Sequence, residues 1–263
     1  MLHTLDKPTA LRQGILIFVY LGVLTALEFF IAVQFVAVSL LIVVALVKAA
    51  LVAYFYMHVY KLNQEEPVDI DQHSYEYKTG SNRLGLWLFL LSDSFVFGGL
   101  MVARVNLLGL TRPEQLNQFL GLAVTAVLLI SSFFMNRGET AMAHGDRRGF
   151  LTNTIITFIL GAGFLLGVVG VEWPLAAHEG LVASFGNSDA GPTGAVFYMM
   201  TGMHAFHVFT GLILLLIVWN KGRKGIYSAE KHWGVEAAAV YWHFVDVVWI
   251  FFYPALYLIG RLA

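Results

Sequence analysis

The stretch FVAVSLLIVVALVKAALVAYF, residues 35–55, contains 21 residues and a single charge, that of Lys48. A helix of about 20 apolar residues is long enough to cross the hydrocarbon layer of a bilayer, which is about 30 Å thick. The strands of membrane barrels are shorter and alternate apolar with polar residues. This stretch does not alternate, so it predicts a transmembrane helix.

Six further runs of the same kind accompany it. Of the 263 residues, 58% are hydrophobic and only 13% are charged, whereas soluble domains carry about 25% charged residues. We therefore predict an all-α fold, a polytopic membrane bundle of seven transmembrane helices. The predicted spans are 14–34, 36–60, 84–108, 117–136, 150–172, 194–219 and 236–261.

The composition also excludes several kinds of site. The chain has no cysteine, which removes disulfides, iron–sulfur clusters and every thiolate site for zinc or copper. Its net charge of −1 gives no reason to expect a nucleic-acid partner. The chemistry of this chain must therefore come from its few buried polar side chains.

The basic residues are distributed unevenly between the two sides of the membrane. Of the 16 lysines and arginines, twelve fall on the side of the N-terminus, three fall on the other side, and Lys48 lies inside a span. Such an excess marks the cytoplasmic side, so we predict a cytoplasmic N-terminus and an external C-terminus.

The polar segment 61–83, with five acids, predicts a cytoplasmic connection between two separately packed units. The predicted units are a two-helix hairpin (1–62), a linker (63–83) and a five-helix bundle (84–263).

Ionisable residues inside the spans are the main candidates for function, because a charge at the bilayer centre costs at least ~2.5–3.5 kcal/mol. At the helical rise of 1.5 Å per residue, five of them lie about 14 to 21 Å from the cytoplasmic end, in one layer near the midplane. Groups at one depth can satisfy one another by pairing. The candidates are Glu28, Lys48, Asp93, His204, His207, His243 and Asp246.

Two of these candidates have partners at a matching depth. Asp93 could carry a proton, but we favour a helix-to-helix hydrogen bond, with His207 as the first partner. Lys48 and Glu28 face one another across the hairpin, where a structural ion pair is favoured over an ion pathway.

The histidines raise the question of metal. His204 and His207 are three residues apart on one helix, and imidazole binds iron, copper and zinc. Two histidines with this spacing cannot bind opposite faces of one haem, so we predict no metal site and favour hydrogen bonding by neutral imidazoles. The pair Gly163 and Gly167 predicts a small-residue face for close helix packing.

Four motifs carry a resemblance to a known family. The stretch GVEAAAVYWHFVDVVW (234–249) closely resembles the last helix of subunit III of haem–copper cytochrome c oxidases. FYMMTGMHAFHVFTG (197–211) matches the preceding helix of that family, LGLWLFLLSD (84–93) resembles an earlier one, and Gly170-x-Glu172-Trp173 fits the helix between them. The family usually has glutamate where this chain has Asp93. Residues 1–62 do not share this resemblance. Through LTALE (24–28) and VALVKAALV (44–52) they look like a truncated prokaryotic oxidase subunit IV, which suggests a fusion of subunit IV with subunit III.

The resemblance implies a subunit without a redox centre or catalytic residues, located in a bacterial cell membrane. The haems and copper would lie in catalytic subunit I and copper-bearing subunit II, on which this chain would pack. Subunit III binds phospholipid in a cleft and supports proton uptake, and such complexes can join a respiratory supercomplex. A basic cluster on the cytoplasmic side suits anionic head groups. The expected lipid-binding residues are Trp87, Arg147, Arg148, Arg223, Lys224, Glu236 and Trp242.

Two alternatives remain open at the level of sequence. The chain could be the corresponding accessory subunit of a quinol oxidase or a nitric oxide reductase. A standalone ion transporter would use the midplane charges directly, but the sequence has no inverted repeat of the kind found in many transporters.

Overall fold

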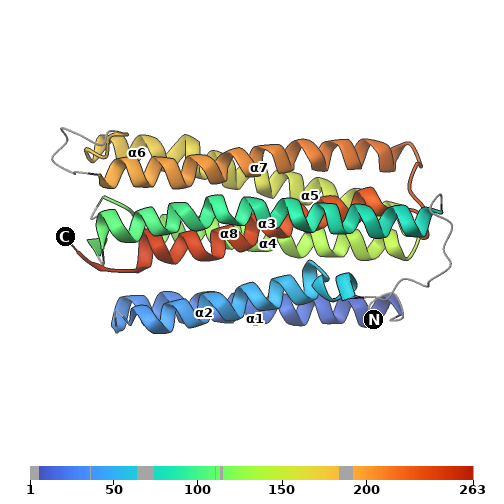
Figure 1. Ribbon diagram of the computed structural model, residues 1–263, viewed down its shortest axis with the longest axis horizontal. Helices are drawn as coiled ribbons and strands as arrows, with labels where there is room; N and C mark the ends of the chain where they lie inside the picture. Colours follow the sequence, from blue (N-terminus) through green and yellow to red (C-terminus); the bar gives the residue numbers. More distant parts are fainter. Residues whose placement is uncertain are drawn as a thin grey trace.

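The computed structural model describes residues 6–35, 37–63, 74–109, 111–112, 115–183 and 192–262. Within these residues, seven helices are long and apolar enough to cross a membrane. Figure 1 shows that they run side by side along one long axis. The predicted all-α membrane bundle of seven helices is therefore confirmed.

The first two helices form the N-terminal hairpin. Helix α1 (Lys7–Gln34) is followed by α2 (Val38–Leu51), which continues as the π-helical turn η2 (Val52–Tyr56) and, after a break, the 3₁₀ turn η3 (Val59–Asn63). Tyr56 donates a hydrogen bond of 3.1 Å to the Gly14 carbonyl and so fastens the hairpin near its open end.

The other helices form the larger bundle, with two short breaks in which π-helical turns replace regular α-helix. A two-residue parallel pairing of β1 (Thr111–Arg112) with β2 (Arg261–Leu262) joins the connection between α3 and α4 to the segment that follows the last helical turn. The helical elements are α3 (Tyr75–Leu108), α4 (Gln118–Ala143), α5 (Arg147–Leu165), η4 (Leu166–Glu172), α6 (Trp173–His178), α7 (Thr193–Arg223), α8 (Trp233–Tyr253) and η5 (Pro254–Leu258).

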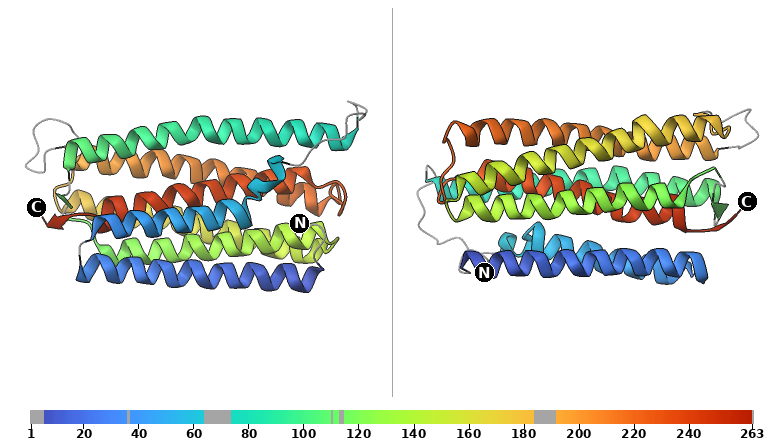
Figure 2. Two further views of the ribbon diagram at one scale, coloured as in Figure 1. Left: turned by 60° about the horizontal axis from the view of Figure 1, so that its bottom comes forward. Right: turned by 180° about the vertical axis from the view of Figure 1, so that it is seen from behind.

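Helix α8 occupies the centre of the bundle and contacts α2, α3, α4 and α7 (Figure 2). Two of its three tryptophans, Trp242 and Trp249, are completely buried. The Trp242 indole donates to the Ser131 hydroxyl at 3.1 Å. A Cβ on Gly161 would lie 2.4 Å from the Trp242 ring, whereas one on Gly163 would meet nothing within 4 Å. The close-packing face of α5 is therefore centred on Gly161. The prediction is wrong for Gly163 and confirmed for Gly167, where a Cβ would lie 2.9 Å from the Val124 side chain.

The hairpin does not pack separately from the bundle. Helix α1 lies against α4 so closely that a Cβ on Gly14 would come within 2.6 Å of the Asn136 amide oxygen. The buried apolar residues of the hairpin and of the bundle form one continuous hydrophobic core. The expectation of two separately packed units is thus replaced by a hairpin docked on α4 and α8.

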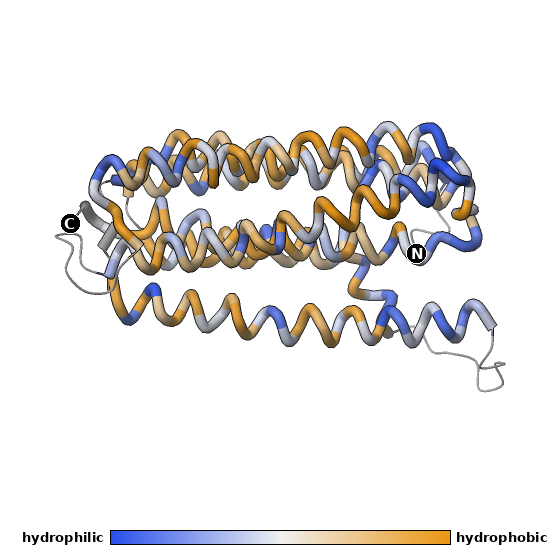
Figure 3. The backbone as a smooth tube through the Cα atoms, turned by 90° about the horizontal axis from the view of Figure 1, so that it is seen from above, coloured by the Kyte–Doolittle hydropathy of each residue, from blue (hydrophilic) through white to orange (hydrophobic). Residues whose placement is uncertain are grey.

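Polar residues gather at the end of the molecule where α1 and α8 begin (Figure 3). We call this the basic end. Helix α3 begins there at Tyr75 rather than at residue 84, because the Ser74 hydroxyl caps it by accepting from the Tyr77 N–H at 3.2 Å. The second half of the predicted linker is therefore helical, and residues 64–73 lie outside the described residues.

Candidate functional site

Asp93 and His207 meet between α3 and α7. The His207 Nε2 atom lies 2.9 Å from the Asp93 Oδ2 atom, so the hydrogen bond predicted from their matching depths is present. The aspartate side chain is 19% exposed and that of the histidine 10% exposed. The Phe97 ring packs against the imidazole at a centroid distance of 4.8 Å. The pair is thus partly covered by protein and partly open on one side.

The hydrogen bonds of His207 fix how many protons this pair holds. The Nδ1 atom lies 2.8 Å from the Met203 carbonyl, which can only accept, so Nδ1 carries a proton. A neutral imidazole would then offer Nε2 as an acceptor, and an ionised Asp93 would face it with a second acceptor. A further proton between Nε2 and Oδ2 removes this conflict. A pair without net charge, with one proton between Nε2 and Oδ2, thus satisfies both ring nitrogens of His207, and an apolar environment favours such a pair.

A long groove runs past this pair toward the basic end. It has a cavity volume of about 880 Å³ and lies between α3, α7 and α8. Most of its walls are apolar, with Asp93 and His207 part-way along and a lysine and a tyrosine near the basic end. Such a shape suits a long apolar chain with a polar head. Its walls include Leu86, Phe89, Asp93, Met203, Phe206, His207, Ile217, Lys221, Tyr227 and Tyr241.

Glu28 and Lys48 form an ion pair inside the hairpin, as predicted from the sequence. Their side chains are 0% and 2% exposed, so this pair is sealed from water and lipid. Asp246 lies on α8, which packs against the hairpin beside the pair. Of the predicted midplane groups, four therefore form two separate pairs, Glu28 with Lys48 and Asp93 with His207, and these pairs do not form one connected layer.

The remaining two histidines are packed among aromatic rings. His204 stacks on Trp249 at a centroid distance of 4.9 Å, and His243 lies 5.0 Å from the Tyr56 ring. Neither ring nitrogen of either histidine has a hydrogen-bond partner among the described residues. Within the same part of the chain, no three His, Cys, Asp or Glu side chains are grouped as a metal site requires. His204 and His207 therefore face different neighbours, and the hydrogen bonding expected of the His204 imidazole is wrong for the described residues, where the ring packs on Trp249 instead.

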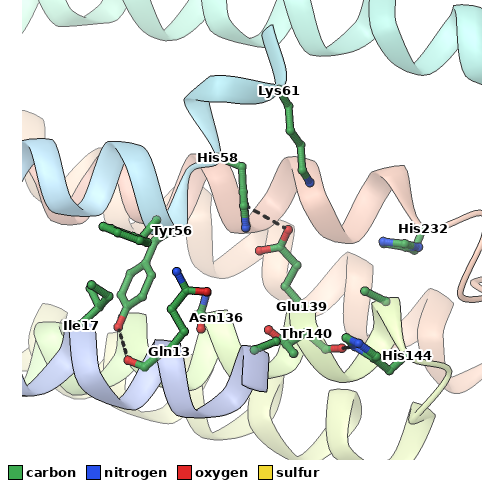
Figure 4. A pocket seen from close by; sticks show the side chains of 14 residues that line it. Gln13, Ile17, Tyr56, His58, Lys61, Asn136, Glu139, Thr140, His144 and His232 are labelled. Atoms are coloured by element: carbon green, nitrogen blue, oxygen red, sulfur yellow. Dashed lines mark hydrogen bonds and ion pairs between the residues drawn. The ribbon is translucent and has the colours of Figure 1, made fainter. Parts of the chain in front are cut away.

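The basic end contains charged contacts that the sequence did not reveal. Glu236 is buried and accepts from Lys61 at 3.1 Å and from Arg83 Nη2 at 3.0 Å. Glu139 on α4 faces His58, with 3.7 Å between Nδ1 and Oε1 (Figure 4). These contacts join the hairpin to the bundle. Glu139 escaped prediction because hydropathy ended the fourth span at residue 136, whereas α4 continues to Ala143.

One exposed ion pair lies at the same end. Lys7 contacts Asp146 at 2.7 Å, and both side chains are more than one third exposed. The hydrogen bond from Lys7, together with the one from the Gly149 N–H, lowers the pKa of Asp146 from its ordinary value. Nearby, burial lowers the pKa of His232, although the negative charge of Glu236 acts in the opposite direction.

The structure places the predicted lipid-binding residues in different surroundings, some buried and some exposed. Trp242 lies in the protein core and Glu236 is engaged in ion pairs, so lipid cannot reach either of them. Arg147 donates to the Gly222 carbonyl at 2.9 Å and thus closes the end of α7. Trp87 is half-buried against the core. Four of the predicted basic side chains remain exposed at the basic end, namely Arg147, Arg148, Arg223 and Lys224.

The opposite end is held by two buried polar groups. The Arg104 guanidinium donates to the Ala255 carbonyl at 2.7 Å and to the Ile259 carbonyl at 3.1 Å. Tyr257 donates to Glu172, the glutamate of the Gly170-x-Glu172-Trp173 motif. Both contacts connect η5 to neighbouring helices, which gives them a structural purpose.

The comparisons with known proteins agree with this architecture. The model of a family described as cytochrome c oxidase subunit III matches residues 7–261. The cytochrome c oxidase subunit 3 of Thermostichus vulcanus is 39% identical over 184 residues, which cover 68% of this chain and 87% of that one. The subunit 3 of Synechocystis sp. is 34% identical over 196 residues, which cover 72% of this chain and 80% of that one. The subunit 3 of Equus caballus is 35% identical over 187 residues, which cover 66% of this chain and 68% of that one.

The family match includes both the hairpin and the helices that carry the Asp93–His207 pair. The chain therefore belongs to the cytochrome c oxidase subunit III family.

Proposed function

We propose that this chain is the accessory membrane subunit of a cytochrome c oxidase and packs on haem- and copper-bearing subunit I, with subunit II supplying the other copper centre. The observation that carries the proposal is the family match from residue 7 to residue 261. Oxygen reduction and proton pumping would take place on the partner subunits. This chain would stabilise them, hold lipid beside them and support proton uptake.

In this proposal Asp93 supports the enzyme and does not perform its chemistry. Its hydrogen bond to His207 joins α3 to α7 part-way along the groove. Because the pair is neutral, it keeps the two helices together without leaving a charge beside lipid. Loss of this bond would loosen α3 and shorten the working life of the complex.

The groove between α3, α7 and α8 would hold a phospholipid. Its apolar walls match acyl chains, and Lys221 near the basic end would attract an anionic head group. The exposed side chains of Arg223 and Lys224 lie just after Lys221 on the same chain segment. They would add to the positive potential that the head group meets.

The basic end would face the cytoplasm of a bacterial cell, and the C-terminal end would face outward. The excess of lysine and arginine at the basic end supports this orientation. Cysteine labelling at Ser81, close to the start of α3, tests it: a membrane-impermeant reagent added outside intact cells should leave this position unlabelled. Efficient labelling would reverse the topology.

The assembly is tested by affinity purification of the full chain from gently solubilised membranes. We expect haem absorbance and a cysteine-containing copper subunit to accompany it. A chain that purifies alone and stable, without haem, would contradict the proposal. Haem without the copper subunit would indicate a quinol oxidase or a nitric oxide reductase instead.

The lipid is tested separately by native mass spectrometry of the same complex. We expect retained phospholipid, and fewer retained molecules after Lys221→Glu. The matched control is Arg12→Glu, which makes the same change of charge at an exposed residue of α1, outside the groove lining. Equal lipid retention in both variants would remove the head-group role of Lys221.

A further inference from the structure

We propose that Glu139 and His58 form a hydrated proton-binding site in a pocket between the hairpin and the bundle, at the basic end. The proposal does not depend on the oxidase assignment, because every group that carries it belongs to this chain. Neither residue is explained by the groove or by the Asp93–His207 pair, which lie on the other side of α8.

The pocket is small and polar (Figure 4). Its cavity volume is about 40 Å³, and one water needs about 10–15 Å³ measured in this way. About three waters would therefore fit. Gln13 on α1, Tyr56 on η2, and Asn136 and Thr140 on α4 contribute hydrogen-bonding groups to its walls.

Glu139 is the group that needs these waters. It is 6% exposed, and its Oε2 atom has no hydrogen-bond partner among the described residues. Its Oε1 atom lies 3.7 Å from the His58 Nδ1 atom, which is too far for a direct hydrogen bond. A buried carboxylate left in this state is costly. Water in the cavity, a bound proton, or both would satisfy it.

His58 reaches this position through an unusual backbone conformation. Its φ of 53° lies in the left-handed region, and among the described residues it is the only residue other than glycine with a positive φ. Such a conformation costs of order 1–3 kcal/mol and persists where the surroundings demand it. Here it turns the chain between η2 and η3 so that the imidazole points toward Glu139 (Figure 4).

The net charge of the surrounding side chains is compatible with one exchangeable proton at this site. Lys61 on η3 and Arg83 on α3 both contact Glu236 on α8, so these three groups together carry one net positive charge. The lowered pKa of His232 keeps that residue neutral at pH 7. Ionised Glu139 therefore neutralises the cluster, while His58 offers a second position for the proton. His144 lines the pocket and is exposed, which gives the site access to bulk water.

The test uses pH-induced infrared difference spectra of the full-length chain in nanodiscs. We expect the carbonyl stretching band of a protonated carboxylic acid at low pH, its loss at high pH, and a shift of the band in D2O. Glu139→Gln should remove this band. The matched control is Glu172→Gln, which alters another buried glutamate at the opposite end of the bundle and should retain it.

A second variant tests the imidazole. His58→Asn is compatible with a left-handed backbone but cannot take a proton, and we expect it to move the midpoint of the band by about half a pH unit or more. The proposal fails if the Glu139→Gln spectrum equals that of the wild type, or if the band does not shift in D2O. It also fails if His58→Asn leaves the midpoint unchanged. Should Glu139→Gln fail to fold, the D2O shift and the His58→Asn midpoint still decide the matter.

Discussion

The Glu28–Lys48 and Asp93–His207 pairs both place an acid beside a base inside the membrane bundle, but protein covers them differently. The first pair is sealed, with side chains 2% exposed or less, whereas the side chains of the second are 19% and 10% exposed along a groove. A sealed pair has no solvent to replace a missing partner. A pair at a groove can be reached by a lipid head group, by water or by a proton. The exposed fraction of the side chains, more than the types of acid and base, therefore determines what each pair can do.

The largest effect that we expect comes from breaking the sealed pair. Lys48→Met leaves Glu28 without its partner, and removal of one member of a buried ion pair costs about 3–5 kcal/mol. Thermal unfolding of the full chain in nanodiscs should show this loss. The double variant Glu28→Gln/Lys48→Met carries no unpaired charge and should recover most of it. A single variant as stable as the wild type would show that water reaches this site.

A smaller effect is expected at the groove. Asp93→Leu leaves the His207 imidazole without its partner, at a cost of about 1–3 kcal/mol. Asp93→Asn keeps a group that can donate to Nε2, so we expect oxidase turnover to stay near that of the wild type. The measurement is turnover and subunit content of the purified complex. An immediate tenfold loss in Asp93→Asn, equal to about 1.4 kcal/mol of barrier, would instead assign Asp93 to a proton path.

The smallest effect is expected at the exposed Lys7–Asp146 pair, which gives the comparison its reference point. Such surface pairs contribute about 0–1 kcal/mol, and we expect Asp146→Asn to cost no more than that at pH 7. Because the folded-state pKa of Asp146 is lowered, its contribution is present above the unfolded pKa and disappears as the pH falls through the folded pKa. Melting temperatures of both proteins, measured between neutral and acid pH, should converge on the acid side. A difference that persists there would contradict this assignment.

Hydropathy and helix rise were enough to predict the seven spans and both pairs. The spans follow from uncharged length, and partners follow from depth, because a membrane leaves a buried charge few alternatives to a neighbour at its own level. The structure contains both pairs that depth predicts, Asp93 with His207 and Glu28 with Lys48.

Contacts that depend on helix rotation could not be predicted in this way. Neither the resemblance nor hydropathy distinguishes a tryptophan that faces lipid from one that faces protein, and Trp242, expected to bind lipid, is enclosed by Ser131 and Gly161. Polar helical turns beyond the hydrocarbon layer are also invisible to a hydropathy window. This is why α3 starts earlier than predicted and why Glu139 was missed.

The central position of α8 has a consequence for biogenesis. It follows α2, α3, α4 and α7, which it contacts, in chain order, and domains of a nascent chain fold from the N-terminus onward. Until α8 leaves the ribosome, Ser131 and Thr125 on α4 lack the indole groups that later bind them. The inserted helices must therefore wait, covered by lipid or by an insertion factor, for the segment that completes them. A chain that stops before α8 would lack the indole donors of Trp242 and Trp249 and the helix that α2, α3, α4 and α7 all contact.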